Sequence, residues 1–200
     1  MNSIDIIRIK KEHIDIISEG SAKAYYDDPL FISFFPDVSK RMNLMYLFKM
    51  GYLQALKYGE IYVTSNLKGA AAWVPHDKAI MSTWDMIKMG IFSLVFKAKG
   101  RDLKKIINYE DFCEKKHKQH AHFPHWYLLN IAVEPDYQRK GYASLLLRDM
   151  LDKIDDQNLP CYLETQNKKN VSMYQKFGFK VLEETIVPGT DFEFYLMLRD

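Results

Sequence analysis

The sequence predicts a single α/β (α+β) domain built on a mixed central sheet of about six to seven strands flanked by helices. Short β-rich runs alternate with longer amphipathic stretches, and the last third follows the order strand, helix, strand, helix, strand, strand. A strand, a helix and a second strand in this order form a parallel pair within one sheet. No linker, internal repeat or low-complexity segment divides residues 1–200, so we expect one domain.

The first part of the chain predicts helices around one hairpin. Periodicity gives a strand at 4–9, a helix at 13–26, a helical stripe from Leu44 to Gly59, a hairpin of 61–64 and 69–74, and two helices within 82–119 separated near Gly100. Asp27-Asp28-Pro29 ends the first helix, because the residue before a proline avoids the α region. Ser65-Asn66 supplies the hairpin turn.

After Pro124 the pattern becomes more regular. The elements expected there are strands at 126–133, 160–163, 181–187 and 192–198, with helices at 142–154 and 170–177. Glu134-Pro135-Asp136 ends the first of these strands, and Pro188-Gly189 marks the turn between the last two.

The charge balance limits the classes of partner. A net charge of +2, from 28 basic and 26 acidic residues, predicts no general attraction to nucleic acid or to an anionic membrane. Basic runs at 97–105 and 115–118 are interleaved with acids, which favours solvated helix faces. The most hydrophobic stretch, 86–96, is interrupted by Lys88 and is shorter than the roughly 20 apolar residues that span a bilayer. We expect it to form a buried or interfacial helix.

Cysteine and histidine usage predicts neither a disulfide framework nor a metal site. Cys113 and Cys161 lie far apart and show no metal-ligand spacing. Histidines cluster at 117, 120, 122 and 125, but no carboxylate or cysteine stands at ligand spacing, so we expect no metal. The residues after Met1 lack the basic and then apolar pattern of a secretory signal. These features predict a cytoplasmic protein.

The segment 133–144 carries the first chemical signal, where an apolar strand passes into an amphipathic helix. Such a junction offers free backbone N–H groups and the positive end of the helix dipole, which suit a pyrophosphate. Gly141 and Ala143 leave room for a ligand, and Arg139 and Lys140 add positive charge. Taken alone, Gln-x-x-Gly-x-Ala is equally consistent with an ordinary turn. The P-loop and the dinucleotide-binding motif fit worse, because their glycine patterns are absent from the sequence.

A second signal follows about thirty residues downstream, at the usual scale of a βαβ unit. Its strand ends at Glu164 and its helix begins near Asn170. Three features therefore occur in order: the turn from Gln138 to Ala143, the stretch from Asn170 to Tyr174, and Lys176-Phe177-Gly178-Phe179. Together they are more specific than any one of them.

On these three features the chain from Trp126 to Arg199 resembles the GNAT superfamily of N-acetyltransferases. Leu163-Glu164-Thr165 and the spacing of Asn170 and Tyr174 also resemble the branch that contains puromycin N-acetyltransferase. Residues 1–120 match only in the order of elements and in 69–73, which look like that branch's third strand. The resemblance implies a parallel pair that splays at the cofactor site, an acceptor-side region at about 1–122 and an acetyl-CoA-binding core at about 123–200.

The resemblance also implies roles for individual residues toward acetyl-CoA. The backbone groups implied to pair with the pantetheine arm are those of Ile131, Ala132 and Val133. The amides implied to hold the pyrophosphate are those of Arg139, Lys140, Gly141, Tyr142, Ala143 and Ser144, in a loop that Gln138 opens. Asn170 would hydrogen-bond the pantetheine or acetyl region, and Tyr174 would protonate the departing thiolate. Glycine is common in the family where this chain has Ala143, but alanine keeps the space open.

The reaction so implied is direct attack of an amine on a thioester, which requires two positioned substrates and a stabilised oxyanion. A backbone N–H of Ile131 or Val133 is a candidate oxyanion donor. Tyr174, with a reference pKa of about 10, suits an acid better than a base. The candidates for the base are, in order, Glu164, Glu134, His125 and a chain of waters.

The sequence therefore predicts an N-acetyltransferase that moves an acetyl group from acetyl-CoA to a primary amine of a small molecule. A non-catalytic acyl-CoA-binding sensor or scaffold and a peptide or protein N-acetyltransferase are the alternatives. Acceptor specificity is expected in 20–60 and 76–122. Candidate acceptor contacts are Asp27, Asp28, Trp73, Trp84 and Tyr127. The acceptor's identity, the use of longer acyl groups and the oligomeric state, a homodimer included, are left open.

Overall fold

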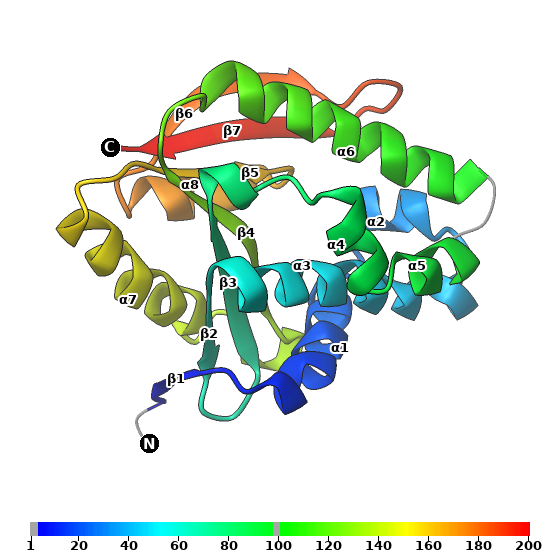
Figure 1. Ribbon diagram of the computed structural model, residues 1–200, viewed down its shortest axis with the longest axis horizontal. Helices are drawn as coiled ribbons and strands as arrows, with labels where there is room; N and C mark the ends of the chain where they lie inside the picture. Colours follow the sequence, from blue (N-terminus) through cyan, green and yellow to red (C-terminus); the bar gives the residue numbers. More distant parts are fainter. Residues whose placement is uncertain (1–3, 98–100) are drawn as a thin grey trace.

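The computed structural model describes residues 4–97 and 101–200 and contains a seven-stranded mixed sheet (Figure 1). Its strands are β1 (Ile6–Arg8), β2 (Glu60–Thr64), β3 (Gly69–Pro75), β4 (Trp126–Val133), β5 (Cys161–Thr165), β6 (Lys180–Ile186) and β7 (Glu193–Arg199). They lie in the order β1-β2-β3-β4-β5-β7-β6, and only β4 and β5 are parallel neighbours. The predicted fold class is confirmed.

Helices cover both faces of the sheet. They are α1 (Ile14–Ala24), α2 (Pro29–Phe34), α3 (Leu44–Tyr58), α4 (Thr83–Lys88), α5 (Ile91–Lys97), α6 (Arg101–His120), α7 (Tyr142–Asp156) and α8 (Lys168–Gln175). Short 3-10 turns occur at Lys11–His13, Val38–Asn43, His76–Lys78 and Pro135–Tyr137. No helix in the described ranges is long and apolar enough to cross a membrane.

The core forms two layers because strand side chains alternate between faces. Ala70, Ala72 and Val74 of β3 pack with α1, α2 and α3, whereas Ala71 and Trp73 pack with α7 and α8. The helix α6 lies over β5, β7 and β6 on the same side of the sheet as α1 and α3 (Figure 1). The sheet therefore has an α1–α3–α6 face and an α7–α8 face.

Two helix boundaries differ from those predicted. The break at Asp27-Asp28-Pro29 is also the start of α2, because proline is tolerated in a first helical turn and the Asp28 carboxylate accepts a hydrogen bond from Leu30 N at 3.0 Å. The stretch 82–97 contains two helices, because Gly90 takes a left-handed conformation with φ 94° and interrupts it. The separation predicted near Gly100 lies outside the described residues.

The parallel pair β4 and β5 separates soon after it begins. Paired positions are Trp126 with Cys161 and Tyr127 with Tyr162. Beyond them β4 follows β3, and β5 follows β7. The register shift opposite Ala72 and Trp73 leaves Leu129 as an extra residue in β4, a β-bulge that bends the strand. The two strands therefore diverge toward their carboxyl ends, as the resemblance implied.

Candidate active site

The free edge of β4 faces the gap between β4 and β5. Glu134 N donates to Lys68 O at 2.9 Å on the β3 side, so alternation directs the peptide groups of Ile131 and Val133 to the other side. In agreement, Ile131 O accepts from the Tyr25 hydroxyl at 2.8 Å and Val133 O from Gln138 Nε2 at 3.0 Å. An extended ligand with amide groups can pair with this edge like an added strand.

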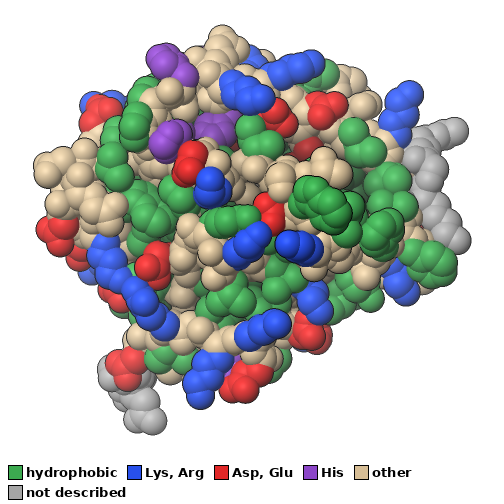
Figure 2. All heavy atoms as spheres, in the orientation of Figure 1, with side chains coloured by type: hydrophobic (Ala, Val, Ile, Leu, Met, Phe, Trp, Pro, Cys, Tyr) green, Lys and Arg blue, Asp and Glu red, His purple; other side chains and the backbone are tan. Residues whose placement is uncertain are grey.

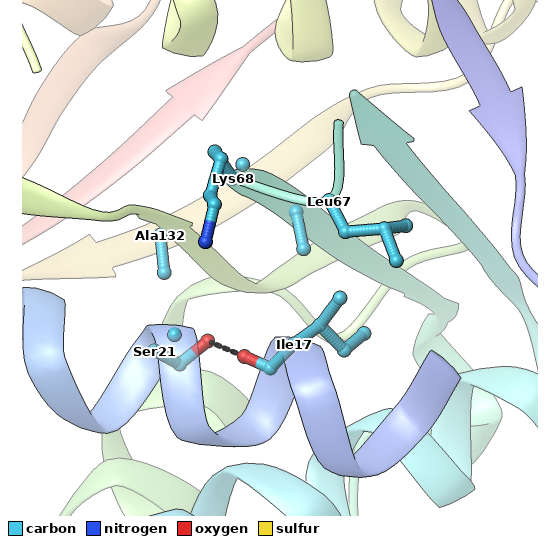
Figure 3. A pocket seen from close by; sticks show the side chains of 8 residues that line it. Ile17, Ser21, Leu67, Lys68 and Ala132 are labelled. Atoms are coloured by element: carbon cyan, nitrogen blue, oxygen red, sulfur yellow. Dashed lines mark hydrogen bonds between the residues drawn. The ribbon is translucent and has the colours of Figure 1, made fainter. Parts of the chain in front are cut away.

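The same alternation separates Ala132 from its neighbours. Ala132 is paired with Ala70, and its peptide groups point to β3 instead of the gap. The geometry therefore favours Ile131 and Val133, and not Ala132, as backbone partners of the ligand. The Ala132 side chain faces a small hollow beside α1, which has room for about one water molecule (Figure 3).

The turn before α7 exposes a row of backbone N–H groups. Gly141 precedes the helix with φ 86°, and the first helical bond runs from Leu145 N to Gly141 O. The N–H groups of Tyr142, Ala143 and Ser144 consequently have no partner within the helix. An added Cβ at Gly141 would meet nothing within 4 Å, so glycine is required here by conformation and not by crowding.

Side chains hold this turn in place and make it positive. The Tyr142 ring is buried, and its hydroxyl accepts from Asn66 Nδ2 of the β2–β3 hairpin at 2.9 Å. Lys140 Nζ donates to Asp136 O at 2.7 Å, and Arg139 is exposed with φ 59°. Free N–H groups, a helix dipole and nearby cations are the features of anion sites at helix N-termini, so we call residues 138–144 the anion turn.

Tyr174 and Asn170 lie on α8, which Asn167 caps by accepting from Lys169 N at 3.0 Å. The Tyr174 ring is 4% exposed and packs edge-on against Phe179. Its hydroxyl makes no hydrogen bond to another described residue, and burial raises its pKa. Asn170 Nδ2 reaches Thr165 Oγ1 at the end of β5, at 3.5 Å.

Tyr25 is a site residue that the sequence did not reveal. Its hydroxyl donates a hydrogen bond to the Ile131 carbonyl oxygen, and its ring stacks on Phe48. Burial, and secondly the charge of Tyr174, raise the pKa of Tyr25. In the sequence Tyr25 is one more apolar position of a helical stripe, with no signal that links it to β4.

Glu164 lies on the α1–α3–α6 face, where β4 and β5 part. Its carboxylate accepts from the Tyr162 hydroxyl at 2.8 Å and from the Tyr127 hydroxyl at 3.3 Å. Burial raises the pKa of Glu164 to about 7, although both tyrosines oppose this shift. Tyr174 packs in the α7–α8 layer, so the gap has a carboxyl group on one face and a phenol on the other.

The other candidate bases have structural partners. Glu134 forms an ion pair with Lys68 at 3.1 Å beside the anion turn, and Lys68 also borders the hollow next to Ile17 and Ser21 (Figure 3). His125 is buried and bonds His117 at 2.8 Å and the Phe123 carbonyl at 2.7 Å. Within the described ranges no cluster of His, Cys, Asp and Glu could hold a metal ion.

The acceptor contacts suggested by the sequence are dispersed. Asp28 caps α2, and Asp27 lies 3.8 Å from Arg41. Trp73 is fully buried in the α7–α8 layer, on the opposite face from Tyr127. Trp84 is 72% exposed on α4. Trp73, Trp84 and Tyr127 do not line one common wall, because strand alternation and an outward helix face separate the three rings.

Comparison with known proteins agrees with this geometry. The model of the Acetyltransferase (GNAT) family matches residues 107–179, which include the β4 edge, the anion turn and Tyr174. The chain is 23% identical over 171 residues to an uncharacterized N-acetyltransferase of Schizosaccharomyces pombe, covering 78% of this chain and 66% of that protein. It is 33% identical over 69 residues to the ribosomal protein bS18-alanine N-acetyltransferase of Escherichia coli, covering 32% and 47% respectively. The chain thus spans less than two thirds of the length of either relative.

Solved structures share the whole fold at low identity. A histone acetyltransferase HPA2-related protein of Corynebacterium glutamicum superimposes with a TM-score of 0.66 at 22% identity, covering 98% of this chain and 96% of that one. Arylalkylamine N-acetyltransferase 2 of Aedes aegypti superimposes with a TM-score of 0.66 at 15% identity, covering 99% of each chain. The family model and the curated relatives thus make this chain similar to GNAT N-acetyltransferases, and the solved structures share its fold.

Proposed function

We propose that this protein is an N-acetyltransferase that moves the acetyl group of acetyl-CoA to a primary amine of a small molecule. One observation carries the proposal: the gap between β4 and β5 joins a free strand edge to an anion site at the start of α7. A linear ligand with amides in its middle and a pyrophosphate at one end matches both features. Acetyl-CoA, the acyl donor of the GNAT family, is such a ligand.

The residues present suit the parts of acetyl-CoA. The amides from Arg139 to Ser144 would receive the pyrophosphate, in the loop that Gln138 opens. The backbone of Ile131 and Val133 would pair with the pantetheine amides, and Asn170 would bond the pantetheine or acetyl end. Tyr25 and Gln138 now bond the two carbonyls on this edge. A carbonyl oxygen has two lone pairs, so the ligand can share these acceptors or displace the side chains.

In the reaction that we propose, the amine nitrogen attacks the thioester carbon, the C–N bond forms and the C–S bond breaks. Glu164 takes the proton that the amine must lose, which a carboxyl of pKa about 7 can do at neutral pH. Tyr174 gives its proton to the departing thiolate. Burial raises the pKa of the tyrosine, but the thiolate would form in the same poorly solvated site, which raises its pKa as well.

Two features favour a small acceptor and a catalytic role. Phe34 of α2 packs edge-on against Tyr109 of α6, so these helices meet across the Glu164 side of the sheet and restrict a long polypeptide. The free Tyr174 hydroxyl and the Glu164 carboxyl with its raised pKa would have no use in a sensor or scaffold that only binds acyl-CoA. Placement beside the puromycin N-acetyltransferase branch stays a proposal that rests on 163–165 and on the Asn170–Tyr174 spacing.

The test is a thiol-release assay with acetyl-CoA across a panel of small amines and short peptides. We expect release with at least one small amine, and we expect Tyr174→Phe to lower kcat by about 10²-fold or more while the Kd for acetyl-CoA stays within about twofold. Unchanged turnover in Tyr174→Phe would remove Tyr174 as the acid. Acetyl-CoA binding without thiol release on any acceptor would favour the sensor, and release on peptides alone would favour a peptide acetyltransferase.

A further inference from the structure

The helices α4 and α5 present apolar side chains to solvent. We name the set Ile80, Trp84, Ile87, Phe92 and Val95 the α4–α5 surface. Trp84 is 72% exposed and Phe92 is 67% exposed. In Figure 2 hydrophobic side chains gather over α4 and α5, at the right of the view, with lysine and arginine around them. Large aromatic side chains this open to water, on two neighbouring helices, mark contact surfaces.

The inward side of α4 shows that this exposure is not forced by the fold. Asp85 is 8% exposed and points to α3, where Lys57 contacts it at 2.6 Å and the Tyr58 hydroxyl at 3.0 Å. Ser82 adds a further hydrogen bond to its carboxylate at 2.8 Å. A soluble helix ordinarily buries its tryptophan and exposes its acid. In α4 the acid Asp85 is buried and Trp84 is exposed, so the outer face of the helix suits an apolar contact.

The surrounding charge is positive although the chain as a whole is nearly neutral. Residues 79–105 contain six bases and two acids, and one of these acids is Asp85, already paired with Lys57. The whole chain has 28 bases and 26 acids, so the remainder carries 22 bases and 24 acids. Lys88 of α4, Lys97 of α5 and Lys104 near the start of α6 are exposed. The segment 79–105 is therefore positive, whereas the rest of the sequence is slightly negative.

We propose that the α4–α5 surface docks on a membrane that contains anionic lipids. Trp84 and Phe92 would enter the boundary between headgroups and acyl chains, where aromatic rings are favoured. Lys88, Lys97 and Lys104 would meet the lipid phosphates, and the negative remainder would be directed away from the membrane. The net charge of the whole chain, +2, gives no sign of this attraction, because the excess of bases is confined to residues 79–105. This inference is independent of the acetyltransferase activity.

A second copy of the chain fits this surface less well. Two copies that met through Trp84 and Phe92 would bring Lys88, Lys97 and Lys104 of each against the same side chains of the other. Like charges at an interface oppose association, and only one acid of the segment is left to offset them. An anionic lipid surface supplies the complementary charge.

The test is co-sedimentation of the protein with vesicles of phosphatidylcholine mixed with phosphatidylserine and with vesicles of phosphatidylcholine alone. We expect binding to the anionic vesicles, weakened by added salt. Reversal of two lysines in Lys88→Glu/Lys104→Glu should weaken this binding by at least about 25-fold, since one lysine near such a surface contributes about fivefold. Trp84→Ser/Phe92→Ser should reduce it by about tenfold or more.

Matched controls separate the surface from general effects. Ile186→Ser on β6, at a side chain that is 56% exposed, and Lys10→Glu, at a side chain that is 76% exposed, should leave vesicle binding within about twofold. Trp84 fluorescence should shift to the blue with anionic vesicles, and this shift should disappear in Trp84→Phe. Absence of binding, or equal loss in the controls, would overturn the proposal. Dimerisation without lipid that Trp84→Ser/Phe92→Ser abolishes would overturn it in favour of self-association.

Discussion

Replacement of Glu164 by glutamine should lower activity and raise stability at the same time. As the proposed base, Glu164 must be ionised, and its pKa is about 7. About a tenth of the carboxyl is then ionised at pH 6 and about nine tenths at pH 8. We therefore expect kcat/KM to rise about tenfold from pH 6 to pH 8 in the wild type. Glu164→Gln should remove this rise and lower the pH 8 value by about 10²- to 10⁴-fold.

The same pKa has a consequence for folding. The pKa of Glu164 is raised from 4.5 to about 7, so its contribution to stability is complete below pH 4.5 and is lost as the pH rises through 7. At pH 8 the buried carboxylate thus destabilises the fold by up to ~3 kcal/mol. Glu164→Gln should recover much of this, measured as a higher urea midpoint at pH 8 with little gain at pH 4.

The assay is thiol release between pH 5.5 and 9 with two amines of well-separated pKa. An inflection that belongs to Glu164 stays near pH 7 with both amines, whereas one that belongs to the substrate moves with its pKa. Tyr162→Phe should move the inflection to higher pH, because the Tyr162 hydroxyl stabilises the carboxylate. Glu134→Gln, in the ion pair with Lys68, should leave it in place. An unchanged inflection in Glu164→Gln would refute Glu164 as the base.

Three further perturbations probe other parts of the account. Gly141→Ala should lower the stability of the fold by ~1–2 kcal/mol and weaken acetyl-CoA binding, because φ is 86° at this position. The control Gly189→Ala, at φ 75° in the β6–β7 turn, should lower stability by a similar amount and leave binding unchanged in isothermal titration. Tyr25→Phe should cost about 1 kcal/mol in urea unfolding and leave the acetyl-CoA Kd equal or lower, because it frees the Ile131 carbonyl; a tenfold weaker Kd would show that Tyr25 itself holds the ligand. Burial lowers the pKa of His117 from 6.5 to about 4, so its stabilising contribution is complete above pH 6.5 and falls by up to ~3 kcal/mol as the pH drops to 4. The urea midpoint of the wild type should therefore fall across this pH window, and that of His117→Phe should fall less.

The region after Pro124 was predicted in nearly all its elements because its signals are local. The strand at 126–133, the glycine turn and the amphipathic helix that follows are each marked by residues within a few positions of one another, and all three are present. The parting of β4 and β5 was implied only by the family resemblance. No periodicity indicates where two parallel strands stop pairing.

What the sequence could not predict depends on contacts between distant residues. Tyr25 bonds a carbonyl that lies 106 positions away, and Trp73 and Tyr127 face opposite sides of the sheet because of strand register. Trp84 looked like a core or pocket residue by its type, yet Asp85 occupies the inward position. Of the two partners of Glu164, only one could be predicted from the sequence. Tyr162 stands two residues earlier on the same strand face, whereas Tyr127 comes from β4.

In the proposed function the β4 edge and the turn before α7 together bind acetyl-CoA. Isothermal titration of the purified protein with acetyl-CoA tests it most directly, with Gly141→Ala and Gly189→Ala as the matched pair. We expect one site per chain with a Kd in the micromolar range, weakened in Gly141→Ala alone. No binding by the folded wild-type protein, or equal affinity in both variants, would contradict it.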